Sequence, residues 1–134
     1  MSNPKKWIQL CVELAYSSSF AGCGKRRSKH GAIVVKNGQI VGVGVNAMRG
    51  TASVHKTEDS WRSSYVHAEE VAIQSAGKKS NGATLYVARV NRSGAARLSE
   101  PCARCEGLIE RSGLKRVVYT VSEEKKISYG VGGH

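Results

Sequence analysis

His67-Ala68-Glu69 and Pro101-Cys102-Ala103-Arg104-Cys105 are the two stretches of this 134-residue sequence that decide its fold. Each stands where a new helix is expected to begin, and together they supply one imidazole and two thiols. Zinc prefers nitrogen and thiolate ligands, and a site with three protein ligands keeps one position for water, as catalytic zinc sites do. We therefore predict that His67, Cys102 and Cys105 bind Zn²⁺.

Glu69 is the candidate catalytic residue of the first stretch. It follows His67 by two positions, and at the entrance of a helix its carboxylate can reach a water that the metal polarises. Its expected role is to take a proton from that water and to pass it to the leaving group. Such general acid–base help contributes about 10²–10⁴-fold to a rate. The adjacent Glu70 is expected to be a solvated helix residue.

Two other interpretations of the cysteines stay open. Cys102 and Cys105 could form a redox pair, in which case the upstream His67 and Glu69 are unrelated to them. A structural zinc site would instead need a fourth protein ligand. The sequence offers four candidates for that ligand, which are Cys11, Cys23, His30 and His55. Taken singly, Cys11 is expected in the core, and both histidines are expected on the surface.

Outward from the two stretches, the hydrophobic pattern predicts alternating helices and strands. Asn37-Gly38 between two apolar runs is a strong hairpin signal. Both runs are almost continuously apolar, which predicts a sheet covered on both faces. The predicted elements are a helix from Pro4 to about Ser19, strands over residues 32–35 and 40–43, a loop over residues 47–65, a helix from about His67 to Ala76, a strand over residues 83–88, a helix from Cys102 to about Ser112 and a strand over residues 116–121.

The order of these elements predicts a layered α/β domain. A short fifth strand at residues 127–131 is expected to return antiparallel, because the connection before it is too short for a helical crossover. A chain of 134 residues is long enough for one compact core and too short for two. We therefore expect residues 1–134 to form a single domain.

The charge of the chain indicates a partner with negative charge. Lys and Arg outnumber Asp and Glu by 21 to 10, which gives a formal net charge of +11. Such an excess attracts polyanions or phosphorylated small molecules. The alternative is a solvated surface whose charge serves only solubility.

The composition excludes a membrane-spanning protein. No apolar run approaches the roughly 20 residues that a spanning helix needs, and the segment from Met1 to Lys6 lacks the apolar stretch of a secretory signal. Four cysteines in a chain of this kind indicate metal binding or catalysis before disulfides. The protein is therefore expected to be cytoplasmic.

Over about residues 5–121 the chain resembles the cytidine/deoxycytidylate deaminase superfamily of zinc-dependent enzymes. Three stretches carry the resemblance: residues 29–46 with Gly31-Ala32 and Asn46, residues 67–73 and residues 100–119. The pattern H-x-E followed by P-C-x-x-C is the known signature of zinc nucleobase deaminases. The resemblance implies a three-layer α/β/α fold around a central mixed sheet of four to five strands. It also implies a homo-oligomer.

The resemblance also implies contacts with the substrate. Asn46 would contact the sugar or the base, the backbone N–H of Ala68 would hold the base carbonyl, and Glu69 would shuttle the proton. Asn46 could alternatively be a turn residue, since Asn favours turns. Arg26, Arg27 and Arg49 are candidates for contact with phosphate, because Arg matches phosphate geometry, although all three could simply be solvated.

Residues 18–35 are most similar to deoxycytidylate deaminases, which implies hydrolysis of dCMP to the uracil nucleotide with release of ammonia. An alternative is a deaminase of single-stranded DNA or of RNA, acting on cytidine or adenosine. The net charge favours that alternative, but aromatic residues, on which single strands stack, are only 6% of the chain. The few candidates for stacking are Trp61, Tyr65 and Tyr86, of which Tyr86 is expected in the core. A non-catalytic zinc-stabilised binding module is a third possibility, which Glu69 counts against.

Overall fold

The computed structural model describes residues 4–17, 29–48, 65–91 and 93–131. The helices are α1 (Pro4–Ser17), α3 (Ala68–Ala76) and α4 (Ala103–Ser112), and a 3₁₀ turn, η2, covers Gly77–Ser80. The strands are β1 (Lys29–Lys36), β2 (Gln39–Val45), β3 (Ala47–Met48), β4 (Tyr65–Val66), β5 (Thr84–Val90), β6 (Ala96–Arg97), β7 (Arg116–Thr120) and β8 (Lys126–Gly130). The predicted helices and strands are therefore present, with boundaries shifted by a few residues.

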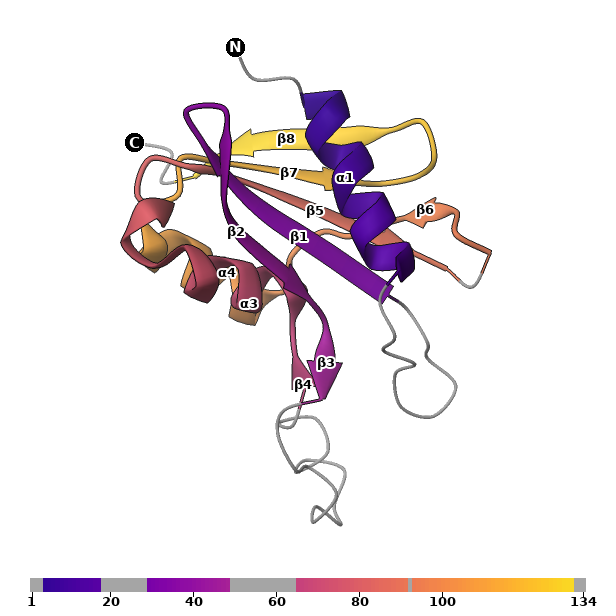
Figure 1. The fold of residues 1–134 in the computed structure, drawn as a ribbon, viewed down its shortest axis with the longest axis horizontal. Helices are drawn as coiled ribbons and strands as arrows, with labels where there is room; N and C mark the ends of the chain where they lie inside the picture. Colours follow the sequence, from indigo (N-terminus) through magenta and orange to yellow (C-terminus); the bar gives the residue numbers. More distant parts are fainter. Residues whose placement is uncertain (1–3, 18–28, 49–64, 92, 132–134) are drawn as a thin grey trace.

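The central sheet is mixed. Its strand order is β2-β1-β5-β7-β8, and the short β6 pairs with β5 (Figure 1). The β5–β7 pair is parallel and the other pairs are antiparallel. The β1–β2 hairpin turns at Asn37 and Gly38, which both have positive φ, as the Asn-Gly signal predicts. The antiparallel return of β8 along β7 agrees with the predicted fifth strand.

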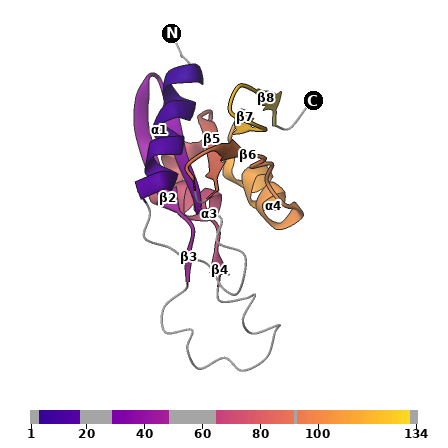
Figure 2. The same ribbon diagram turned by 90° about the vertical axis from the view of Figure 1, so that its right-hand side faces the viewer.

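Helices cover both faces of this sheet, so the predicted three-layer α/β/α fold is confirmed. Figure 2 shows α1 on one side of the sheet and α4 on the other. The cluster between α1 and the sheet contains Trp7, Cys11, Ile33, Val35, Tyr86, Ala88 and Val118. The cluster on the opposite face includes Ala32, Val34, Ala68, Ala72, Leu85, Val87, Ile109 and Val117. Alternate residues of β1 and β5 point to opposite faces, which is why one strand feeds both clusters.

The sequence-based expectations differ from the structure in three places. β2 is an edge strand, and its Ile40 and Val43 are 44% and 42% exposed, so it is not covered on both faces as expected. The expected loop at 47–65 begins with β3 and ends with β4, which pair as a small separate sheet. β6 was not predicted, because a two-residue strand is too short to leave a periodic pattern.

Two glycines of β2 bring the backbone of α3 against the sheet. A Cβ on Gly42 would collide with the carbonyl oxygen of Ala72, and a Cβ on Gly44 would collide with the carbonyl oxygen of Ala68. Only glycine allows so close an approach of strand and helix. This contact fixes the N-terminal end of α3, where the first of the two sequence stretches lies.

Candidate active site

His67, Cys102 and Cys105 converge at the N-terminal ends of two helices. His67 is the N-cap of α3 and Cys102 is the N-cap of α4, while Cys105 lies in the first turn of α4. The Nδ1 atom of His67 is 3.3 Å from Sγ of Cys105 and 3.6 Å from Sγ of Cys102. Candidate ligand atoms from all three residues lie within 4.8 Å of one another, and no other such group occurs in the described part of the chain. One imidazole nitrogen and two sulfurs are a donor set that fits zinc.

The two thiols of this group differ in exposure. Cys102 is exposed, whereas Cys105 is only 2% exposed. Burial raises the pKa of the Cys105 thiol, and the nearby Glu69 raises it further. Because a thiol must lose its proton to ligate a metal, zinc binding at this group should release protons.

Glu69 is a buried carboxyl next to this group. It is 5% exposed, and burial raises its pKa to about 7, while the neighbouring charge of Glu70 acts in the same direction. A hydrogen bond from its own backbone acts in the opposite direction. A carboxyl that titrates near neutral pH can both accept and return a proton, as a general acid–base residue must.

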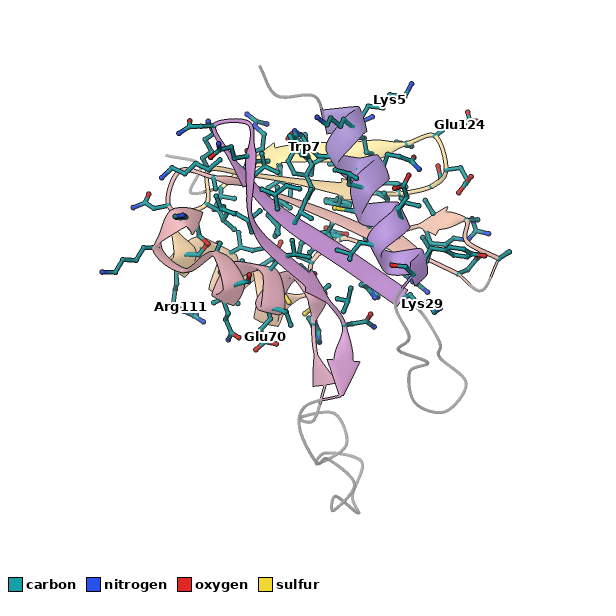
Figure 3. The ribbon with its side chains drawn as sticks, viewed as in Figure 1. Lys5, Trp7, Lys29, Glu70, Arg111 and Glu124 are labelled. Carbon is teal, nitrogen blue, oxygen red and sulfur yellow. The ribbon has the colours of Figure 1, made fainter. Side chains whose placement is uncertain are left out.

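Glu70 is a helix-capping residue and not the solvated residue that was expected. Its Oε1 accepts a hydrogen bond from the backbone N–H of His67 at 3.3 Å. Figure 3 labels its side chain at the end of α3 that follows β4. The contact satisfies a backbone donor at the helix N-terminus and orients the residue that carries the imidazole.

A cavity of about 220 Å³ opens beside these residues. It is lined by His30, Asn46, His67, Ala68, Glu69, Glu100 and Cys102. Ala68 is the first residue of α3, and the backbone N–H groups of a first helical turn have no partner within the helix. The backbone of Ala68 is therefore suited to donate to a carbonyl group held in the cavity.

Asn46 is buried in this cavity and is only 6% exposed. Its Oδ1 accepts a hydrogen bond from the backbone N–H of His30 at 2.9 Å. Its own backbone N–H donates to the carbonyl oxygen of His30 at 3.4 Å. The side chain is therefore held in a fixed direction, which a mere turn residue does not need.

His30 was expected on the surface, and the structure corrects this. It lines the cavity, and burial together with the charges of Arg89 and His67 lowers its pKa to about 4. The signal that the sequence reading missed is the alternation of β1. His30 precedes the buried Ala32 by two positions and therefore points to the same face of the sheet. Glu100 is a second lining residue that the sequence reading did not identify.

Neither of the described candidates for a fourth zinc ligand, Cys11 and His30, lies in the ligand group of His67, Cys102 and Cys105. Cys11 belongs to α1 and packs against the opposite face of the sheet, where its thiol donates to the carbonyl oxygen of Tyr86 at 3.3 Å. His30 does not join the group of ligand atoms around His67. Six residues named from the sequence lie outside the described residues: Cys23, Arg26, Arg27, Arg49, His55 and Trp61.

Among the described helices, none is long and apolar enough to cross a membrane.

Comparisons with known proteins agree with this geometry. The family model for the cytidine and deoxycytidylate deaminase zinc-binding region matches residues 1–121. Riboflavin biosynthesis protein RibD of Aquifex aeolicus is 35% identical over 134 residues, which cover 96% of this chain but only 30% of RibD. The deoxycytidylate deaminase of Mycobacterium phage D29 is 34% identical over 110 residues, which cover 69% of this chain and 78% of the phage protein.

A solved structure shares the fold. The crystal structure of cytidine deaminase from Burkholderia pseudomallei matches with a TM-score of 0.68 at 20% identity, over 98% of this chain and 94% of that one. At this identity the match supports the arrangement of the three layers and nothing finer.

Proposed function

Because the chain belongs to the cytidine and deoxycytidylate deaminase family, we propose that it is a zinc-dependent hydrolase that replaces the C4 amine of a cytosine nucleoside or nucleotide with oxygen, with dCMP as the first substrate to test. The products are the uracil compound and ammonia. The observation that carries the proposal is the convergence of His67, Cys102 and Cys105 beside the buried carboxyl of Glu69 at one cavity.

His67, Cys102 and Cys105 would hold the zinc ion. Zinc with three protein ligands supplies a nucleophile at neutral pH, because it lowers the pKa of a bound water from about 15.7 to about 7. Glu69 would take one proton from the attacking water and deliver it to the ring nitrogen. It would then take the second proton of that water from the new C4 hydroxyl and deliver it to the amine, which leaves as ammonia. The backbone N–H of Ala68 holds the base carbonyl, and the fixed amide of Asn46 orients the sugar or the base.

The assignment of dCMP is supported by the relative from phage D29, whose name is deoxycytidylate deaminase. Arg26 and Arg49 remain our candidates for contact with its phosphate. Association into a homo-oligomer is part of the same proposal, and light scattering on the zinc-loaded protein tests it.

A second candidate function is the deamination step of a RibD protein. The 35% identity to Aquifex aeolicus RibD supports it. A bacterial strain whose RibD lacks the segment that this chain matches separates the two candidates. Growth without added riboflavin on expression of this chain favours the second candidate, and failure to grow favours the first.

The direct test is a panel of substrates given to zinc-loaded protein. The panel contains cytidine, deoxycytidine, their monophosphates, single-stranded DNA and RNA, and the readout is ammonia together with the mass of the product. We expect dCMP to be converted fastest, and Glu69→Ala to convert nothing. If the wild type, like Glu69→Ala, releases no ammonia from any of these compounds, the proposed deamination of a cytosine nucleoside or nucleotide fails.

Salt dependence separates a monomeric substrate from a polynucleotide. A strand that contacts many phosphates releases many counterions, so its turnover should fall steeply with salt. Turnover of a single monophosphate should fall much less. Steep salt dependence with DNA or RNA as the best substrate would favour the polynucleotide alternative that the net charge of +11 suggests.

A further inference from the structure

His30 lines the cavity, and the proposed mechanism does not use its side chain. Its backbone holds Asn46 through two hydrogen bonds, one to Oδ1 of the side chain and one from the backbone N–H. His30 and Asn46 therefore form one corner of the cavity, built from neighbouring strands of the sheet. The backbone of His30 therefore positions both its own imidazole ring and the side-chain amide of Asn46.

The imidazole of His30 has an unmet hydrogen-bonding requirement. Its Nδ1 is buried and has no hydrogen-bond partner among the described residues. Native proteins leave few buried polar atoms without a partner, because the loss of hydration is then uncompensated. A half-turn about the Cβ–Cγ bond exchanges Nδ1 with a ring carbon, so either edge of the ring can present nitrogen to the cavity. The missing partner can therefore arrive with a ligand in the cavity.

We propose that the imidazole of His30 makes a hydrogen bond to the 3′-hydroxyl of the nucleoside or nucleotide in this cavity, the hydroxyl that ribose and 2′-deoxyribose share, and that His30 thereby favours substrates that carry this hydroxyl over 3′-deoxy analogues. This inference rests on the proposed function, because it takes a nucleoside or nucleotide as the ligand. It adds a substrate-contacting residue on β1 to Asn46, which follows β2, and to Ala68 and Glu69 of α3.

The position of His30 indicates the sugar and not the reacting end of the base. The amine that is replaced must lie beside Glu69 and the ligand group of His67, Cys102 and Cys105, and His30 is not a member of that group. His30 instead adjoins Asn46, at the part of the cavity that lies next to β1 and β2. When the base lies with its amine beside Glu69, the sugar is the part of the nucleoside that can reach His30 and Asn46.

The chemistry of the ring indicates a hydroxyl and not a phosphate. Burial is the first cause that lowers the pKa of His30, and burial favours the neutral ring. A neutral imidazole offers one donor and one acceptor, and a hydroxyl offers the same pair. A phosphate offers only acceptors and is bound best by charged donors such as Arg.

The kinetic test compares His30→Val and His30→Asn on zinc-loaded protein. Asn keeps a donor and an acceptor near the position of Nδ1, whereas Val keeps neither. The substrates are cytidine, 2′-deoxycytidine and 3′-deoxycytidine, each also as the monophosphate. In the wild type, removal of the contacted hydroxyl should lower kcat/KM by roughly 10- to 100-fold. In His30→Val this difference between substrates should disappear, and His30→Asn should restore part of it.

A purely structural role gives a different result. In that case His30→Val lowers kcat/KM by the same factor for every analogue, and the ratio between them stays as in the wild type. That outcome, or a His30→Val variant with wild-type kinetics, overturns the inference. Zinc content and the unfolding midpoint of each variant are measured in parallel.

A spectroscopic test keeps the inference separate from the proposed function. Protein labelled with ¹⁵N-histidine gives ring signals for its four histidines, and the His30→Asn spectrum assigns that of His30. The signal should shift when a ribonucleoside or its uracil product is added, and shift much less with the analogue that lacks the contacted hydroxyl. A shift without turnover supports the contact and rejects the proposed reaction. Turnover without a hydroxyl-dependent shift rejects the contact and leaves the reaction intact.

Discussion

Cys11 and Cys105 are two buried thiols on opposite faces of one sheet. They are 0% and 2% exposed, and burial raises the pKa of both. The thiol of Cys11 donates to a backbone carbonyl within an apolar cluster, whereas Sγ of Cys105 lies 3.3 Å from the imidazole of His67. Burial is therefore common to both, and only the convergence of further donors makes one of them a candidate metal ligand.

The largest expected effect is the loss of zinc when the buried thiol of Cys105, and not that of Cys11, is replaced. Cys105→Ser should abolish stable zinc binding and activity, because a hydroxyl is a far weaker zinc ligand than a thiolate. Cys11→Ala should retain one zinc per chain, since Cys11 lies on the other face of the sheet. Metal analysis after gel filtration measures both. Equal loss of zinc in the two variants contradicts the assignment of the site.

The second effect concerns the two adjacent carboxylates of α3. Glu69→Gln should lower kcat by about 10²–10⁴-fold while zinc stays bound, because the amide cannot take up a proton. The matched control is Glu70→Gln, whose amide oxygen can still accept the hydrogen bond from the backbone N–H of His67, so turnover and zinc content should stay close to the wild-type values. Steady-state kinetics with metal analysis separates the two variants. A comparable loss of turnover in both variants would contradict the assignment of proton transfer to Glu69.

How much of the site the sequence predicts depends on how local each signal is. His67 and Cys102 are helix N-caps and Cys105 follows within one turn, so a short motif contains the ligands and the geometry that presents them. The Asn37-Gly38 turn is equally local. Such features could be predicted because neighbouring residues determine them.

The features that could not be predicted depend on distant parts of the chain. His30 joins the site because β1 lies beside β2 and beneath α3, and a single residue carries no mark of that neighbourhood. The exposure of Ile40 and Val43 follows from the position of β2 at the edge of the sheet, whereas its apolar sequence resembles that of a central strand. Glu70 was misjudged because the N-cap of its capping box is His67 and not the Ser or Thr that marks this motif in a sequence.

The third prediction compares the packing of the two faces. Gly44→Ala and Gly31→Ala each force a methyl group into a backbone, that of α3 in the first case and that of α1 in the second. Both should lower the free energy of unfolding by about 1–3 kcal/mol, the usual cost of overpacking. Only Gly44→Ala should also weaken zinc binding, because it displaces the helix that begins after His67. Urea unfolding and chelator competition measure the two properties, and weakened zinc binding in Gly31→Ala alone contradicts the comparison.

The smallest expected effect is a pH dependence of the free energy of unfolding that comes from Cys11, on the face of the sheet opposite the candidate zinc site. The folded protein raises the pKa of Cys11 above its ordinary value of 9.0, because burial disfavours the thiolate. The unfolded chain therefore loses this proton first as the pH rises. The contribution of Cys11 is complete below the unfolded pKa and declines above it, by up to about 1.4 kcal/mol per pH unit.

Cys11→Ala isolates this contribution from the other groups that titrate in alkali. Its free energy of unfolding should fall less steeply above about pH 9 than that of the wild type, so the two curves converge there. Urea denaturation of the zinc-saturated proteins across this range, with a reductant present, measures the difference in slope. Parallel curves would show that the unfolded chain does not deprotonate Cys11 ahead of the folded one. Burial would then not raise the pKa of the Cys11 thiol as it raises that of Cys105.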